Sequence, residues 1–136
     1  MEKYESHQVR ILRPSAVIYR TLSDFSNFTP ILQDKVEEWQ ADADSCSFKV
    51  KGFTARLRIV EREENKLVKV TGDEGSPFPF FFWLQLHPVD DTDTRMRLVL
   101  HIELNMMMKM MIGGKIREAM DQIADKIAES FNNAPI

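Results

Sequence analysis

The sequence has few of the features that mark secreted, membrane or nucleic-acid-binding proteins. It contains one cysteine in 136 residues, Cys46, which has no partner for an internal disulfide, and a reducing compartment suits such a chain. No stretch approaches the about 18 consecutive apolar residues of a membrane helix, and the N-terminus is charged where a signal peptide would be apolar. Lysine and arginine nowhere form a run of five, and the net charge is −3, whereas phosphate binding needs a concentrated basic face. We therefore expect a cytoplasmic protein with no nucleic-acid partner and no integral membrane segment.

The composition indicates a folded domain. Hydrophobic residues make up 43% of the chain and charged residues 29%, which is typical of globular rather than disordered sequences. The length is that of one ordinary domain with a substantial core, and no shift in composition marks a linker. We expect a single domain spanning residues 1–136.

The first third of the chain predicts one strand and two short helices. Residues 4–12 alternate as a strand does, which places His7 on the inner face with Val9 and Ile11. Pro14 suits the turn that follows, and Ser15 is the expected N-cap of a helix that runs to about residue 26. A second helix is expected to begin at Thr29 and Pro30 and to continue at helical spacing through Trp39.

From residue 45 the hydrophobic period changes to two, which predicts antiparallel strands. Strands are expected over residues 45–51, 53–60 and 67–71, followed by a loop over residues 72–79 that holds two glycines and two prolines. Residues 80–88 and 94–104 predict a long hairpin with one buried face and one wet face. The buried face would carry Phe80, Phe82, Leu84, Leu86, Met96, Leu98, Leu100, Ile102 and Leu104.

A single apolar stripe predicts one long C-terminal helix. Its members recur at helical spacing over more than five turns, with charged residues on the far side. They are Ile112, Ile116, Ala119, Met120, Ile123, Ala124, Ile127, Ala128 and Phe131. The order of elements predicts an α+β fold in which a curved antiparallel sheet of about six or seven strands wraps around this helix.

Two segments resemble one known superfamily. The opening reads Val9-x-Ile11, Pro14-Ser15, Val17-Ile18-Tyr19 and Leu22-Ser23-Asp24-Phe25, and the hairpin runs from Phe82-Trp83-Leu84-Gln85-Leu86-x-Pro88 to Thr94-Arg95-Met96. Both resemble the START-like, helix-grip superfamily, which includes polyketide cyclases, lipid-transfer START domains, coenzyme Q-binding proteins and the birch-pollen-allergen group. The resemblance implies the helix-grip fold and an internal cavity, but that superfamily hosts many unrelated activities. No catalytic signature of an enzymatic branch stands at matching positions.

The most unusual stretch is Met106–Ile112, which holds five of the eight methionines and is followed by Gly113 and Gly114. Methionine adapts to apolar ligands of irregular shape, and glycines remove side-chain volume where the helix meets the sheet. We therefore expect a cavity that binds a small apolar ligand such as a lipid, an isoprenoid or an aromatic polyketide-like compound. The expected lining is Phe28, Phe53, Phe80, Phe82, Met107, Met108, Met111 and Ile112, with Gly113 and Gly114 providing space. A loosely packed helix entrance or a self-association patch would also explain the methionines.

Alternation places Phe81 and Trp83 on the outer face of the hairpin, across from Val99 and His101. Exposed aromatic side chains in one patch often mark an interface, so a homodimer contact is one expectation. Cover by a neighbouring element or ordinary exposure is the alternative.

The sequence offers little for catalysis and suggests no cofactor or metal site. A cyclase or dehydratase type of enzyme would need an ionisable side chain inside the cavity, and by alternation only His7 qualifies. His87 and His101 share the outer face, and their spacing fits no metal signature. Cys46 alternates inward and is expected to be an inert, buried side chain. A third possibility is a protein-interaction module that acts through the outer aromatic face.

Overall fold

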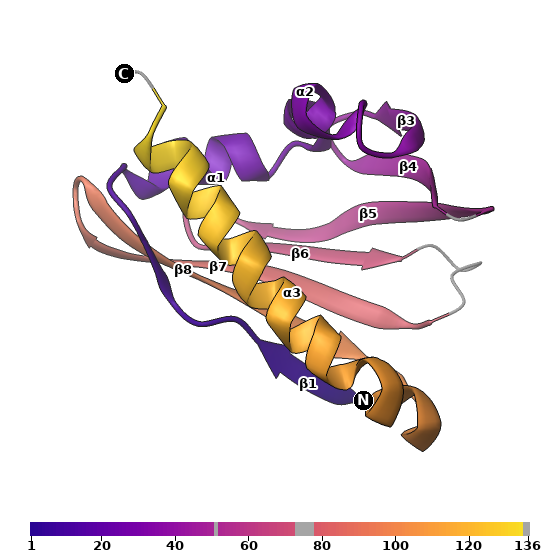
Figure 1. The fold of residues 1–136 in the computed structure, drawn as a ribbon. Coiled ribbons are helices and arrows are strands. Elements are labelled where there is room, and N and C mark those ends of the chain that lie inside the picture. Colours follow the sequence, from indigo (N-terminus) through magenta and orange to yellow (C-terminus); the bar gives the residue numbers. More distant parts are fainter. Residues whose placement is uncertain (51, 73–77, 135–136) are drawn as a thin grey trace.

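One antiparallel sheet curves around the long C-terminal helix (Figure 1). The computed structural model of the chain describes residues 1–50, 52–72 and 78–134, and the predicted loop over residues 72–79 lies mostly outside these ranges. The described elements are β1 (Glu2–Glu5), β2 (Val9–Ile11), α1 (Ser15–Leu22), the 3-10 helix η1 (Phe25–Phe28), α2 (Thr29–Leu32), β3 (Glu37–Ala41), β4 (Ser45–Val50), β5 (Phe53–Glu63), β6 (Leu67–Gly72), β7 (Phe80–Asp90), β8 (Asp93–Ile102) and α3 (Met106–Asn132).

The sheet confirms the predicted helix-grip, α+β architecture. Its strands follow the order β1-β8-β7-β6-β5-β4-β3, with β2 also paired to β8, and every described pairing is antiparallel. The described residues form eight strands rather than six or seven. The additional strands arise because the predicted first strand is divided into β1 and β2, and because β3 occupies part of the predicted second helix.

The predicted first strand is divided into β1 and β2 by an extra residue. Glu5 pairs with Val99 and Val9 pairs with Met96, so this chain segment uses one residue more than β8 does over the same length. An extra residue reverses the alternation that follows it. Tyr4 and Val9 are therefore both buried, and the predicted inward position of His7 is wrong because its side chain lies outside.

Ser6 fills the gap that the extra residue leaves in the ladder. Its backbone N–H donates to the Leu98 carbonyl at 2.9 Å, and its hydroxyl accepts from the Leu98 N–H at 2.9 Å while donating to the His7 carbonyl at 2.8 Å. Ser6 and Leu98 are both buried. The side chain thus replaces a backbone partner that the irregular strand cannot supply.

The predicted second helix is mostly wrong. The helix α2 has only four residues, Thr29–Leu32, and residues 37–41 form strand β3 beside β4. Glu38 has a φ of 55°, which no helix contains, so the helical spacing through Trp39 is not realised. Pairing with β4 instead supplies the backbone hydrogen bonds of this segment. The N-cap of α1 is Pro14, without a side-chain hydrogen bond, and not the predicted Ser15.

The helix α3 contains the predicted stripe and begins six residues earlier, at Met106, but Ala119 and Ile123 of that stripe are exposed. Asn105 is its N-cap and accepts from the Met108 N–H at 2.8 Å through its side chain. The buried members of the stripe are Met120, Ala124 and Ala128. They pack into the core with Tyr4, Val9, Ile11, Ile18, Leu22, Val68, Val70, Leu84, Leu86, Met96 and Leu98.

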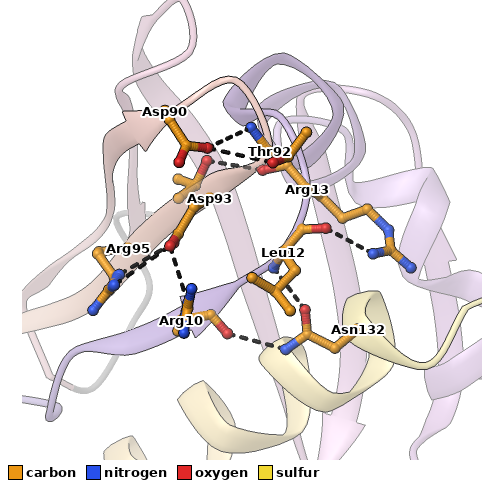
Figure 2. A network of polar contacts seen from close by, with 9 residues as sticks. Arg10, Leu12, Arg13, Asp90, Thr92, Asp93, Arg95 and Asn132 are labelled. Atoms are coloured by element: carbon orange, nitrogen blue, oxygen red, sulfur yellow. Dashed lines mark hydrogen bonds and ion pairs between the residues drawn. The ribbon is translucent and has the colours of Figure 1, made fainter.

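Polar side chains fix β2 to the end of α3 and to the β7–β8 turn (Figure 2). Asn132 accepts from the Leu12 N–H at 2.7 Å and donates to the Arg10 carbonyl at 3.0 Å, as a neighbouring strand would. Asp93 accepts from Arg95 at 3.2 Å and from Arg10 at 3.0 Å. The hydrogen bond from Arg95, with the nearby charges of both arginines, holds the pKa of Asp93 below its usual value. These contacts close one end of the structure.

Candidate functional site

The concave face of the sheet is closed at one end and less densely covered at the other. Near the β7–β8 turn the inward side chains of Leu84, Leu86, Met96 and Leu98 are buried. Farther along the same two strands, Phe82, Leu100 and Ile102 are only partly buried. Large apolar side chains thus remain partly accessible toward the far end of the strands.

Burial decreases in the same direction along α3. Ala128, Ala124 and Met120 are buried toward its C-terminal end, whereas Ile116, Ile112 and Met108 are half-buried toward its N-terminal end. We call the set of half-buried inward residues at this end the open half of the grip: Leu57, Ile59, Phe82, Leu100, Ile102, Leu104, Met108, Ile112 and Ile116. These residues form the candidate site.

The helix α2 and the strand β3 lie above the sheet near β4 and β5 (Figure 1), whereas α1 contacts β6 and β7. The Trp39 ring packs against Phe48 at 6.1 Å between centroids, and its indole N–H donates to the Thr29 hydroxyl at 2.8 Å. Trp39 lies on β3 and not on the helix expected there, so its contact with Phe48 was not predicted. The alternation of Phe48 on the neighbouring strand was the one signal that pointed to an apolar partner at this place.

The members of the predicted lining differ in burial. Phe28, Phe80, Phe82, Met108 and Ile112 are half-buried. Met107 and Met111 are 71% and 68% exposed, so they point to solvent. The side chain of Phe53 lies outside the described part of the structure.

The two glycines of α3 have different surroundings. A Cβ on Gly113 would lie 3.0 Å from the Tyr4 hydroxyl, whereas one on Gly114 would meet nothing within 4 Å. Gly113 is therefore needed for the close approach of Tyr4 from β1, and the space expected there for a ligand is occupied by this tyrosine. Gly114 lies on the exposed side of the helix.

His7 links the connection between β1 and β2 to α3 and contributes nothing to the concave face. Its Nε2 lies 2.6 Å from the Asp125 carboxylate, and its backbone N–H donates to Asp121 at 2.7 Å. The hydrogen bond to Asp125 raises the pKa of His7. Desolvation lowers that pKa by less, and the negative charges of Asp121 and Asp125 raise it further. His7, which was expected to be the one ionisable side chain of the interior, therefore lies outside and connects this segment to α3.

Cys46 is buried as predicted. Burial raises the pKa of its thiol to about 11, so the thiolate is scarce at neutral pH and the side chain is chemically inert. Among the described residues, no three or more histidine, cysteine, aspartate or glutamate side chains gather where they could hold a metal ion. None of the helices within the described ranges has the length and apolarity needed to cross a bilayer.

A hollow of about 410 Å³ lies over β3, β4 and β5, outside the grip. Ser47 pairs with Arg56 and Ser45 pairs with Arg58 across the strands, so these four side chains share the outer face. Gln40 and Asp42 complete its polar rim. Such a surface does not suit the predicted apolar ligand.

The outer face of the hairpin carries an aromatic cluster as predicted. The Trp83 ring meets the His101 ring edge-on at 4.7 Å and the Phe81 ring at 6.1 Å, and the Lys69 ammonium lies 4.5 Å from the Phe81 centroid. We define the outer cluster as Lys69, Phe81, Trp83, Val99 and His101, of which Val99 is buried. Nε2 of His101 is buried and has no hydrogen-bond partner among the described residues.

Solved structures share this fold, although no protein-family model and no curated protein matches the sequence. A protein from Thermobifida fusca, determined in solution by NMR, is 17% identical with a TM-score of 0.73 over 96% of this chain and 93% of its own. The Aha1 dimer from Colwellia psychrerythraea is 14% identical with a TM-score of 0.72 over 98% of both chains. Norcoclaurine synthase from Thalictrum flavum, in complex with dopamine and hydroxybenzaldehyde, is 12% identical with a TM-score of 0.73 over 99% of this chain and 89% of its own. At these identities the likeness confirms the START-like, helix-grip fold.

Proposed function

From the helix-grip fold that the chain shares with these proteins, we propose that it binds a small hydrophobic ligand, such as a lipid, an isoprenoid or an aromatic polyketide-like compound, in the open half of the grip. The observation that carries the proposal is the difference in burial along two strands. Phe82, Leu100 and Ile102 stay partly accessible, whereas the inward side chains nearer the β7–β8 turn are buried, namely Leu84, Leu86, Met96 and Leu98. Covering apolar surface contributes about 25 cal/mol per Å². A ligand there would gain affinity without displacing the packed core.

From the predicted lining, the proposal retains Phe28, Phe80, Phe82, Met108 and Ile112, the half-buried members. Met108 is well suited to this place because its flexible thioether adapts to irregular shapes. The buried thiol of Cys46 fits a reducing compartment, so the proposal places the protein in the cytoplasm.

Titration with a fluorescent fatty acid, together with native mass spectrometry of protein purified from cells, tests this proposal. We expect saturable binding, and we expect Phe82→Ser to weaken it several-fold. The ligand covers only the part of the ring that the protein leaves accessible, a fraction of the about 1.5–3 kcal/mol for a whole side chain, and 1.4 kcal/mol is a factor of ten. The control is Val89→Ser, an exposed change on the same strand. Both variants are compared by circular dichroism for retained folding. Absence of saturable uptake by the folded protein would contradict the proposal.

Norcoclaurine synthase shows that the helix-grip fold can carry an enzyme, so a cyclase or dehydratase type of activity is the alternative use of the same surface. Such chemistry needs an ionisable group beside the ligand. His7, the candidate from the sequence, is held outside by Asp121 and Asp125. Ligand binding is therefore the better supported of the two functions.

The outer cluster favours a second proposal, a homodimer contact through Phe81 and Trp83. The solved Aha1 structure with this fold is a dimer, and a lysine stacked on aromatic rings beside a buried valine is a surface that a second copy could cover. We expect sedimentation velocity to show a dimer that Phe81→Ser with Trp83→Ser converts to monomer. Phe81 and Trp83 are half-buried, so retained folding of the variant is checked by circular dichroism. The control change Val60→Ser with Val89→Ser, at exposed strand positions, should leave the dimer intact. A monomeric parent protein would remove this proposal and leave the ligand proposal standing.

A further inference from the structure

A second hollow of about 410 Å³ lies on the outer face of the β7–β8 hairpin. We call it the hairpin hollow, and it is lined by Gln8, Gln85, Leu86, His87, Arg95 and Arg97. Leu86 is buried, so polar side chains form the accessible wall. Each of these five polar side chains carries N–H donors, and the lining contains no aspartate or glutamate.

The strand register brings these donors together. On the hairpin, side chains that lie opposite each other share the outer face, as in the pairs Gln85–Arg97 and His87–Arg95. Gln8 joins them because of the extra residue that divides β1 from β2. Unbroken alternation from Tyr4 would turn Gln8 inward, but Val9 takes that inward position opposite Met96. Donors from three chain segments therefore surround one space.

Most of these donors have no acceptor. In the part of the chain that the structure describes, no hydrogen bond or ion pair is made by the side chains of Gln8, Gln85, His87 and Arg97. Arg95 donates to the buried Asp93 carboxylate at 3.2 Å, and Arg10 donates to the same carboxylate at 3.0 Å (Figure 2). Arg97 lies four residues beyond Asp93, about 13 Å along β8, so its guanidinium has no share in that carboxylate.

Acidic side chains on the neighbouring segments bind other groups. Glu5, which points outward on β1, lies 3.3 Å from the Lys3 ammonium. Asp121 and Asp125 on α3 lie 3.5 Å and 2.6 Å from the His7 ring nitrogens. Farther from the hollow, the β7–β8 turn holds two more acids, Asp90 and Asp91. The hairpin hollow therefore keeps an excess of positive charge.

The hollow over β3, β4 and β5 has the same volume and also two arginines, Arg56 and Arg58, but its lining includes Asp42. The hydrogen bonds that Asp42 accepts from the backbone of Asp44 and Ser45 hold its pKa below the usual value, so this carboxylate is ionised at neutral pH. A negative charge thus stands in the wall of that hollow. The two hollows differ in the one property that decides whether an anion is attracted.

The occupant of the hairpin hollow has to be negative and has to accept several hydrogen bonds from different directions. A phosphoryl group meets both conditions, because its terminal oxygens accept from several donors at once and a guanidinium binds two of them in parallel. A carboxylate offers its two oxygens along one edge only. The accessible wall has no apolar side chain to cover an acyl chain, which favours a small soluble molecule over a lipid.

We propose that the hairpin hollow binds the phosphoryl group of a small soluble molecule. Arg97 donates to the phosphate oxygens, with Gln8, Gln85 and His87 completing the set of donors, while Arg95 stays on Asp93 and adds its charge. The site lies on the opposite face of the sheet from the open half of the grip. It is therefore independent of the proposed function.

Titration of the ¹⁵N-labelled full chain with sodium phosphate, against sodium chloride at equal ionic strength, tests the proposal by NMR. We expect saturable shifts of the side-chain N–H signals of Arg97, Gln8 and Gln85. We expect Arg97→Gln to raise the phosphate Kd about tenfold or more, the effect of losing a charge-assisted hydrogen bond. Arg58→Gln, in the other hollow, is the matched control and should leave the Kd unchanged. Both arginines are exposed and have no ion pair among the described residues, so both variants should fold.

A second pair of variants keeps the test independent of Arg97. Gln85→Glu gives the hairpin hollow a carboxylate such as Asp42 gives the other hollow, and it should abolish saturable phosphate binding. Gln85→Ala removes one neutral donor at the same exposed position and should weaken binding only a few-fold. Equal phosphate binding by Gln85→Glu and Gln85→Ala would overturn the proposal.

Three further outcomes would also overturn the proposal. Phosphate and chloride could shift the same signals equally, or the shifts could be as large at Arg56 and Arg58, and both results would mean general screening of charge. Acetate could bind as tightly as phosphate, which would mean a site for any small anion. The protein could ignore inorganic phosphate and yet float with vesicles that contain phosphatidic acid, which would mean a lipid headgroup. Arg97→Gln should leave the fatty-acid titration unchanged, so failure of the proposed function is seen separately.

Discussion

Replacing Ile18 with alanine is expected to lower the free energy of unfolding by about 2–5 kcal/mol, the range for truncating a fully buried isoleucine. Ile18 has no exposed surface and is one of two buried residues of α1, the other being Leu22. An eight-residue helix is not stable alone, so its packing on the sheet is what keeps it folded. Urea unfolding followed by circular dichroism measures the change.

The control for this prediction is Leu12→Ala, which truncates a side chain that is 47% exposed near the same helix. We expect it to change the free energy of unfolding by no more than about 0.5 kcal/mol. A loss below 1 kcal/mol for Ile18→Ala would mean that α1 does not close the packed end of the grip. The division of the concave face into a packed half and an open half would then be wrong.

The parts of the fold that the sequence predicted well are those where one physical signal acts alone. In the hairpin, each residue from Phe80 to Leu86 alternates strictly, and Leu84 and Leu86 are buried as the alternation requires. In α3, the stripe through Met120, Ala124 and Ala128 has a single period, so only one face can enter the core. Long periodic segments leave no competing arrangement.

The errors fall where one residue interrupts the period. Val60 is an extra residue in β5, because Ile59 pairs with Val70 and Glu61 with Lys69. The interruption turns Arg62 to the inner face, where its guanidinium donates to the carbonyls of Ser23 and Ala43 and lies 2.8 Å from Asp44. The sequence around Arg62, a charged residue near the end of a strand, does not predict these contacts with the segments that hold Ser23 and Ala43. Such bulges are decided by tertiary contacts that the pattern does not contain.

The candidate site was predicted only in part, for a different reason. The methionines before Gly113 were expected to line the interior because their side chains adapt to apolar ligands. The helix begins at Met106 with Asn105 as its cap, and its first turns extend beyond the core, which leaves Met107 and Met111 in solvent. An apolar side chain is expected to be buried from solvent. Its identity does not say whether the same chain or another molecule buries it.

Replacing Ser6 with alanine is expected to cost about 1–3 kcal/mol in the free energy of unfolding, the penalty for a buried N–H without an acceptor. The Ser6 hydroxyl is the acceptor of the Leu98 N–H, and neither residue is accessible enough for water to take over this role. The extra residue between Glu5 and Val9 has displaced the backbone carbonyl that would pair there in a regular strand. The Ser6 hydroxyl therefore allows the inward and outward alternation of side chains to reverse between Tyr4 and Val9 without leaving the Leu98 N–H unpaired.

Hydrogen exchange at Leu98 distinguishes this explanation from a general loss of packing. In the Ser6→Ala variant, the Leu98 amide should exchange faster relative to its neighbours on β8, whereas a packing defect would accelerate the whole strand with global stability. Ser15→Ala is the matched control, because Ser15 makes no capping hydrogen bond and its loss should be small. If Ser6→Ala were as stable as the parent protein, the reversal between Tyr4 and Val9 would have to be maintained by side-chain burial alone. The N-terminal strand would then owe its position on β8 to Tyr4, whose hydroxyl lies against Gly113, and not to the ladder.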